Sequence, residues 1–168
     1  MKNSVIVALM AFLAVVMANA QTKLTGKASC SKPETNYSID VGDRTGHTLM
    51  LQKATCKWTT PIEIEGMHSQ DGIDVTSADA MGSTISERGY HVATMDSGDK
   101  FFVRYQGTIK ANKEGTAAFE GKWTFISGTG KLKGIKGGGT YKGTGSADGG
   151  GNIEVEGEYS VGATKAGR

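Results

Sequence analysis

The strongest constraint on the fold is a two-residue alternation of apolar and polar side chains that recurs in two segments of the C-terminal half. Successive side chains of a β-strand point to opposite sides of the sheet, so such a pattern predicts strands with one buried and one hydrated face. A slip of one residue would bury three glutamates, which fixes the register of the second segment. The buried faces comprise Ala117, Phe119, Gly121, Trp123 and Phe125 in one segment and Ile153, Val155, Gly157, Tyr159 and Val161 in the other; Glu154, Glu156 and Glu158 face water.

The two segments belong to an internal repeat that predicts two matching β-hairpins. The stretch beginning at Tyr105 is echoed from Tyr141, with Glu120-Gly121 repeated as Glu156-Gly157. Polar, glycine-containing turns are predicted at 112–115 and 148–151. Solenoids and propellers need about three or more repeats, so both copies are expected within one sheet.

Further strand signals arrive about every ten residues, as is typical of sandwiches and barrels. A turn is predicted at 70–72, and a loop or bulged strand at 78–88, with a helical turn as the alternative. A bulge is predicted after Leu51, where the apolar parity shifts. The remaining predicted strands cover 22–31, 36–46 with a turn, 47–58, the run from Pro61, 73–77 and 90–95, followed by a turn at 96–99.

Glycines occur inside the predicted strands at positions 107, 121, 143 and 157, as expected where a sheet bends strongly. Closure into a barrel also removes exposed strand edges. The sequence therefore predicts an all-β fold, a single antiparallel, eight-stranded closed barrel over residues 21–168 with little or no helix. An open sandwich is the alternative.

The first twenty residues have the composition of a signal peptide. A positive start at Lys2 precedes an apolar run, and Ala18-Asn19-Ala20 supplies the small-x-small pattern that signal peptidase cuts. The run is too short to span a bilayer, so no stable membrane insertion is expected after cleavage following Ala20. We expect a secreted or periplasmic protein; an uncleaved N-terminal anchor is the alternative.

Two cysteines, Cys30 and Cys56, are the only ones in the chain. In an oxidising compartment an even count predicts one disulfide, and the absence of CxxC spacing disfavours a reactive thiol pair. A formal net charge of +2 without a basic run disfavours nucleic acid as a partner.

No motif for catalysis, metal or cofactor binding is present. Gly130-Lys131 is followed by Leu132 and not by Ser or Thr, which excludes a phosphate-binding loop, and the glycines at 137–139 leave no helix for a dinucleotide. No GxSxG elbow occurs. His47, His68 and His91 lack zinc-ligand spacing, although His91 could meet Asp40 or Asp74 in space. We therefore predict no metal and no cofactor.

The passage WTFISGTGKLKGIKGGGTYKG resembles a signature of small secreted bacterial β-barrel proteins and, more distantly, the GGTG turn of dirigent proteins and allene oxide cyclases. Gly128, Thr129, Gly130, Gly134 and Gly137 carry the match, with Ser127 where glycine is common. The resemblance implies an eight-stranded barrel with this turn near one end, often as a homotrimer. Some relatives cyclise or isomerise oxylipins and others guide radical coupling. Their catalytic residues have no matching motif here, so none is carried over.

Three functional hypotheses follow. The first is a non-enzymatic barrel that binds a small apolar molecule in its lumen. The alternative is that the aromatic side chains of the lumen fill it as an ordinary core. The second is a cyclase or isomerase, which needs an ionisable group such as His91 or Glu63 in the barrel mouth. The third is a structural or stress-related envelope protein. The candidate lumen residues are Tyr105, Trp123, Tyr141, Tyr159 and His91.

Overall fold

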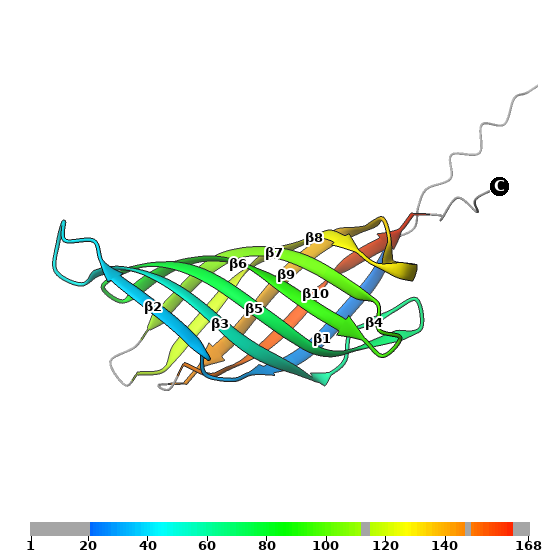
Figure 1. Cartoon of the computed structure of the whole chain (residues 1–168), viewed down its shortest axis with the longest axis horizontal. Helices are drawn as coiled ribbons and strands as arrows, with labels where there is room; N and C mark the ends of the chain where they lie inside the picture. The colour runs from blue at the N-terminus through cyan, green and yellow to red at the C-terminus, as the bar shows by residue number, and fades with distance from the viewer. Residues whose placement is uncertain (1–20, 112–114, 147–148, 163–168) are drawn as a thin grey trace, which may run out of the picture.

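Strand pairing in the computed structural model, which describes residues 21–111, 115–146 and 149–162, closes one sheet on itself. The ring runs β1–β10–β9–β8–β7–β6–β5–β3 and returns to β1, so eight strands form a closed antiparallel barrel (Figure 1). Two short strands lie outside the ring, β2 on β3 and β4 on β5. The predicted fold class is confirmed. The strands are β1 (Thr22–Cys30), β2 (Thr35–Asp40), β3 (His47–Thr60), β4 (Glu63–Ile64), β5 (Met67–Met81), β6 (Thr84–Met95), β7 (Lys100–Ala111), β8 (Ala117–Gly128), β9 (Ile135–Gly145) and β10 (Gly151–Val161).

Helix is confined, within these described residues, to the single 3-10 turn η1 (Gly130–Leu132). Across the same ranges no helix is long and apolar enough to cross a bilayer. The predicted signal peptide, residues 1–20, lies outside the described residues.

The repeated segments form the predicted hairpins β7–β8 and β9–β10, which pair through β8 and β9. Trp123, Phe125 and Tyr159 are buried, whereas Glu154 and Glu156 are exposed. The predicted alternation of faces is therefore confirmed. The predicted turns fall partly on residues 112–114 and 147–148, outside the described ranges.

One end of the barrel is filled by an apolar plug. The loop that carries β4 inserts Ile64, which is fully buried, and η1 inserts Leu132, also fully buried. Two hydrogen bonds to side chains hold the β4 loop in place: the Ile62 N–H donates to Ser69 Oγ at 2.8 Å, and the Glu65 N–H donates to the Tyr159 hydroxyl at 3.3 Å. Met67, Met95, Phe101 and Ile135 complete this buried cluster.

The glycine-rich turn after β8 docks η1 against the β6–β7 turn. Thr129 exchanges two hydrogen bonds of 2.8 Å with the Lys100 backbone, and the Lys131 N–H donates to Asp99 Oδ2 at 3.1 Å. Gly130 has a φ of +51°, and the Asp99 carboxylate occupies the place where its Cβ would lie, so only glycine fits there. The lysines of the turn are exposed. This passage is a structural joint at the closed end of the barrel.

Three local predictions were wrong. Residues 70–72 are no turn: they form a bulge inside the continuous strand β5, and the chain reverses instead at Gly66, whose φ is +73°. No bulge follows Leu51, because β3 pairs with β5 in one unbroken register; the parity shift arises because Leu49 and Leu51 face outward. The segment 78–88 forms two strands joined at Gly82.

The barrel closes at the seam between β1 and β3. Only four residue pairs form this seam, from Lys27↔Thr60 to Cys30↔Cys56, and a bulge follows Lys27. The Cys30–Cys56 disulfide links the last of these pairs, and the predicted disulfide is confirmed. Beyond Cys30 the chain leaves the ring, and β2 takes the place of β1 beside β3.

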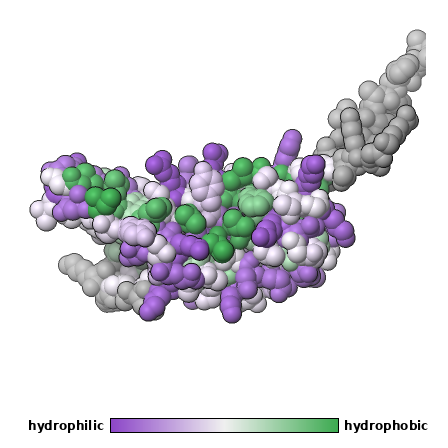
Figure 2. All heavy atoms as spheres, viewed as in Figure 1, coloured by the Kyte–Doolittle hydropathy of each residue, from purple (hydrophilic) through white to green (hydrophobic). Residues whose placement is uncertain are grey.

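Apolar side chains gather on the outer face of β2, β3 and β5 (Figure 2). Tyr37 and Ile39 are 66% and 68% exposed, and they pair across the strands with Leu51 and Leu49. Val75 of β5 continues this outer face. These exposed apolar side chains lie on adjacent strands and so form one continuous patch on the outside of the barrel.

Candidate functional site: the barrel lumen

The lumen holds a cavity of about 390 Å³ above the plug. Its wall includes Cys30, Ser31 and Pro33 together with residues 145–146 and 149–151, so the cavity opens at the end of the barrel away from η1. Seven aromatic rings line it, contributed by Trp58, Phe101, Tyr105, Phe119, Trp123, Phe125 and Tyr141. They pack edge to face, with ring centroids 5.1 Å apart for Trp123 and Phe125 and 5.7 Å apart for Tyr105 and Tyr141. The wall is thus rigid and mostly apolar.

A buried acid–imidazole pair lies in the deeper part of the cavity. Asp74 on β5 and His91 on β6 are directly paired across the strands, and Nδ1 of His91 lies 2.7 Å from Oδ1 of Asp74. Their side chains are only 16% and 14% exposed. Nε2 of His91 and Nε1 of Trp58 are buried without a partner in the described residues. The pair therefore orients an imidazole whose second nitrogen is unsatisfied.

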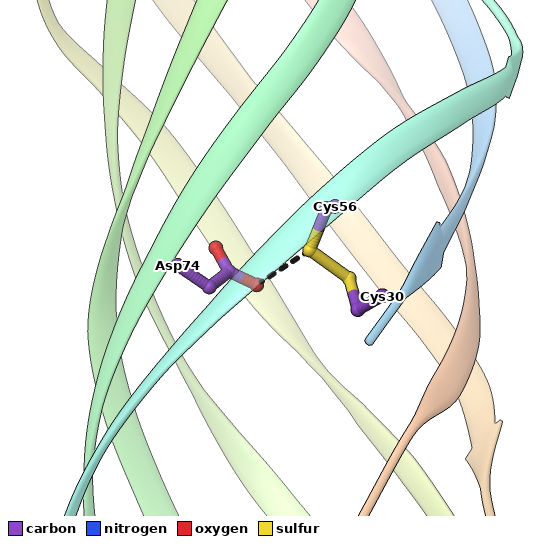
Figure 3. A group of neighbouring side chains, drawn as sticks. All are labelled: Cys30, Cys56 and Asp74. Carbon is purple, nitrogen blue, oxygen red and sulfur yellow. Dashed lines mark hydrogen bonds between the residues drawn. A yellow bond between two sulfur atoms is a disulfide. The ribbon is translucent and has the colours of Figure 1, made fainter. Parts of the chain in front are cut away.

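The Cys30–Cys56 disulfide lies beside Asp74 of this pair (Figure 3). Oδ2 of Asp74 points at Sγ of Cys56 from 3.5 Å. An oxidised sulfur has no proton to donate, so this approach is a packing contact. Cys30, Cys56 and Asp74 are the one trio of potential metal ligands among the described residues, but both sulfurs are bonded to each other, which leaves only the carboxylate as a ligand.

Two hydroxyl groups form a second polar region nearer the mouth. The Tyr141 hydroxyl donates to Oε1 of Glu87 at 2.7 Å, and the Tyr105 hydroxyl lies 2.6 Å from Oγ1 of Thr76. Glu87 and His91 face the lumen from the same strand, four positions apart, so their Cα atoms are separated by roughly 13 Å. A polar stripe thus runs along one wall of an aromatic cavity.

Burial shifts the titration of this stripe. Removal from water raises the pKa of Glu87, and the nearby charge of Asp74 raises it further. Burial likewise raises the pKa of Tyr105 and of Tyr141, and the charges of Asp74 and Glu87 add to both shifts. Both phenols are therefore neutral hydrogen-bonding groups near pH 7, and burial makes the Glu87 carboxyl hold its proton more readily than an exposed glutamate would.

Inward-facing glycines make room for the rings. A Cβ at Gly89 would overlap the ring of Tyr105, and one at Gly121 would overlap the ring of Tyr141. The predicted link between strand glycines and barrel architecture thus has a packing cause: each such glycine lets a large side chain from a neighbouring strand lie flat on the wall.

Four of the five candidate residues lie on the cavity wall: Tyr105, Trp123, Tyr141 and His91. Tyr159 does not; it is buried in the plug, where its hydroxyl holds the β4 loop. Glu63, the other candidate ionisable group, is exposed outside the barrel.

Sequence reasoning missed Glu87 as a wall residue. A usable signal exists, because Ile85, Glu87, Gly89, His91, Ala93 and Met95 share one strand parity and place a single acid on an otherwise buried face. Of the two aspartates suggested for His91, the structure brings Asp74 to it and keeps Asp40 on the exposed strand β2.

No protein-family model matches this sequence, and no curated protein matches it significantly.

Proposed function

We propose that this protein is a small-molecule-binding β-barrel that takes a mostly apolar ligand into its lumen. The observation that carries the proposal is the cavity of about 390 Å³, lined by aromatic rings and crossed by one polar stripe. Ligand sites in proteins combine a concave apolar wall with a few convergent polar groups. A barrel serving only as a structural element has no need of such a space, so the cavity favours binding over the envelope-protein hypothesis.

Intrinsic fluorescence offers a direct test, because both tryptophans of the chain, Trp58 and Trp123, lie on the cavity wall. A ligand should change their emission in a saturable way, and native mass spectrometry of protein from its own host should show a bound small molecule. Ala54→Phe adds a ring inside the lumen and should abolish binding. Lys53→Phe adds the same ring outside and should not. Binding that survives Ala54→Phe would contradict a luminal site.

A second candidate, a cyclase or isomerase, is favoured by the Asp74–His91 pair and by Glu87. A buried imidazole and a carboxyl with a raised pKa can move a proton within a confined ligand. Turnover of an oxylipin, followed by product chromatography and lost in His91→Ala, would support this activity. Binding without turnover would support the non-enzymatic function.

We also propose that the protein is secreted or periplasmic. The disulfide between Cys30 and Cys56 supports an oxidising compartment. A mature N-terminus at Gln21, read by mass spectrometry of the native protein, is the expected result. The homotrimer implied by the family resemblance stays a prediction, which light scattering of the purified protein can test.

A further inference from the structure

The cavity wall carries acidic side chains but no lysine or arginine among the described residues. The chain has 19 lysines and arginines, yet none lies among the described residues that line the lumen. The acidic and imidazole side chains there are those of Asp74, Glu87 and His91. The ionisable groups of this wall are thus acidic apart from one imidazole, although basic residues are abundant elsewhere in the chain.

Among the residues that the structure describes, neither carboxylate has a hydrogen bond or ion pair with a lysine or arginine. Asp74 is paired with Nδ1 of His91, and Glu87 accepts a hydrogen bond from the neutral hydroxyl of Tyr141. A buried carboxylate that lacks a cation bears a desolvation cost that a positive ligand would offset. Burial is the main cause that raises the pKa of Glu87 and of the two phenols, and the neighbouring carboxylates raise it further.

The rings next to Glu87 favour a cation as well. Tyr105 and Tyr141 meet edge to face at 5.7 Å, and Phe119 lies against Tyr141 at 6.4 Å. The faces of aromatic rings attract ammonium groups, most strongly where water is excluded. A site that combines a carboxylate with such rings binds an amine better than a neutral or anionic molecule of the same shape.

We propose that the lumen selects an organic cation: a molecule with one protonated amine, placed between Glu87 and the Tyr105–Tyr141 pair, and an apolar or aromatic body extending toward Phe101. This inference rests on the proposed binding function and names the ligand class for that site. The cavity of about 390 Å³ leaves room for a body the size of a phenylethyl group.

Three probes that share one skeleton test the proposal. The amine is 2-phenylethylamine, the neutral probe is 2-phenylethanol and the anion is 3-phenylpropanoate, each titrated at pH 7 against tryptophan emission and by calorimetry. We expect the amine to bind about tenfold or more tighter than the alcohol, as for a charge-assisted hydrogen bond, and the anion to bind most weakly.

The variant Glu87→Gln keeps an acceptor for the Tyr141 hydroxyl but removes the charge. It should weaken amine binding about tenfold and leave alcohol binding within about twofold. Glu63→Gln makes the same charge change outside the barrel and should alter neither. Unchanged alcohol binding also shows that the variant lumen has folded.

The outcomes separate the two proposals. If the alcohol binds as tightly as the amine, or the anion binds tightest, the cation inference is wrong and the binding function stands. If Glu87→Gln leaves a real amine preference intact, the assignment to Glu87 is wrong. If no probe binds and none is found with the native protein, the binding function fails, and the inference with it.

Discussion

Removing the disulfide should weaken the barrel at its closing seam. The seam has only four residue pairs and an adjacent bulge, whereas the pairing of β3 with β5 extends over eleven, from His47↔Met81 to Lys57↔Asp71. The Cys30–Cys56 bond links residues separated by 26 positions. Loop-closure entropy for a loop of that length corresponds to about 3.5 kcal/mol of unfolding free energy at 25 °C.

Guanidinium unfolding measures this quantity directly. With a slope of about 3.5 kcal/mol per molar denaturant, the midpoint should fall by about 1 M when the wild-type disulfide is reduced. The double variant Cys30→Ala, Cys56→Ala should show a similar midpoint without reductant. Adding reductant to that double variant should change nothing, which controls for effects of the reagent.

Two results would refute this reasoning. A reduced wild type that unfolds within about 0.2 M of the oxidised protein would show that strand pairing alone holds the seam. An unchanged midpoint in the double variant, with tryptophan emission also unchanged, would show that the bond contributes neither to stability nor to the shape of the cavity wall.

Three further predictions concern the lumen and the plug. Gly72→Ala places a methyl group where the His91 ring lies, so the imidazole should turn away from Asp74 while the fold is retained. NMR should show a changed imidazole signal, and an unchanged signal would contradict this packing of Gly72 against His91. Burial raises the pKa of Glu87 in the folded state, so ionising this carboxyl favours the unfolded state, and the unfolding free energy of the wild type should fall as pH rises above about 4.5. The unfolding free energy of Glu87→Gln should depend less on pH. Parallel pH profiles of the two proteins would contradict the raised pKa. Leu132→Ala should cost about 2–5 kcal/mol in denaturant unfolding, and Lys131→Ala, its exposed neighbour, less than about 0.5; equal costs would contradict the plug.

The sequence was sufficient to predict the strands and which of their faces are buried. A sustained alternation of apolar and polar residues is compatible only with a strand that has one buried face. The sequence was also sufficient for the disulfide, since two cysteines allow one pairing. It was insufficient for the β5 bulge, because Gln70, Asp71 and Gly72 suit a turn and a bulge equally well. The pairing of β5 with β6 decides between a turn and a bulge, and the local sequence does not contain that information.

The polar stripe was harder to predict than the ring of aromatics. His91 and Asp74 are far apart in sequence and meet only because β5 and β6 pair in one register. Tyr159 illustrates the opposite error: its parity is that of a wall residue, but the β4 loop folds over it and turns that position into plug. Whether an inward-facing residue lines the cavity or lies in the plug depends on where the loops insert into the barrel. The alternation of apolar and polar residues carries no information about that.

The pairing of β1 with β10 bears on how the protein is made. Thr22–Cys30 are synthesised first of the described strands, and their partners on one edge, Gly151–Val161, are synthesised last. Hairpins such as β7–β8 can form early, but closure must wait for the final strand, and such distant pairings are slow. Until then β1 exposes an open edge that can pair with other chains. A chain that stops before Gly151 should therefore lose the whole barrel and aggregate.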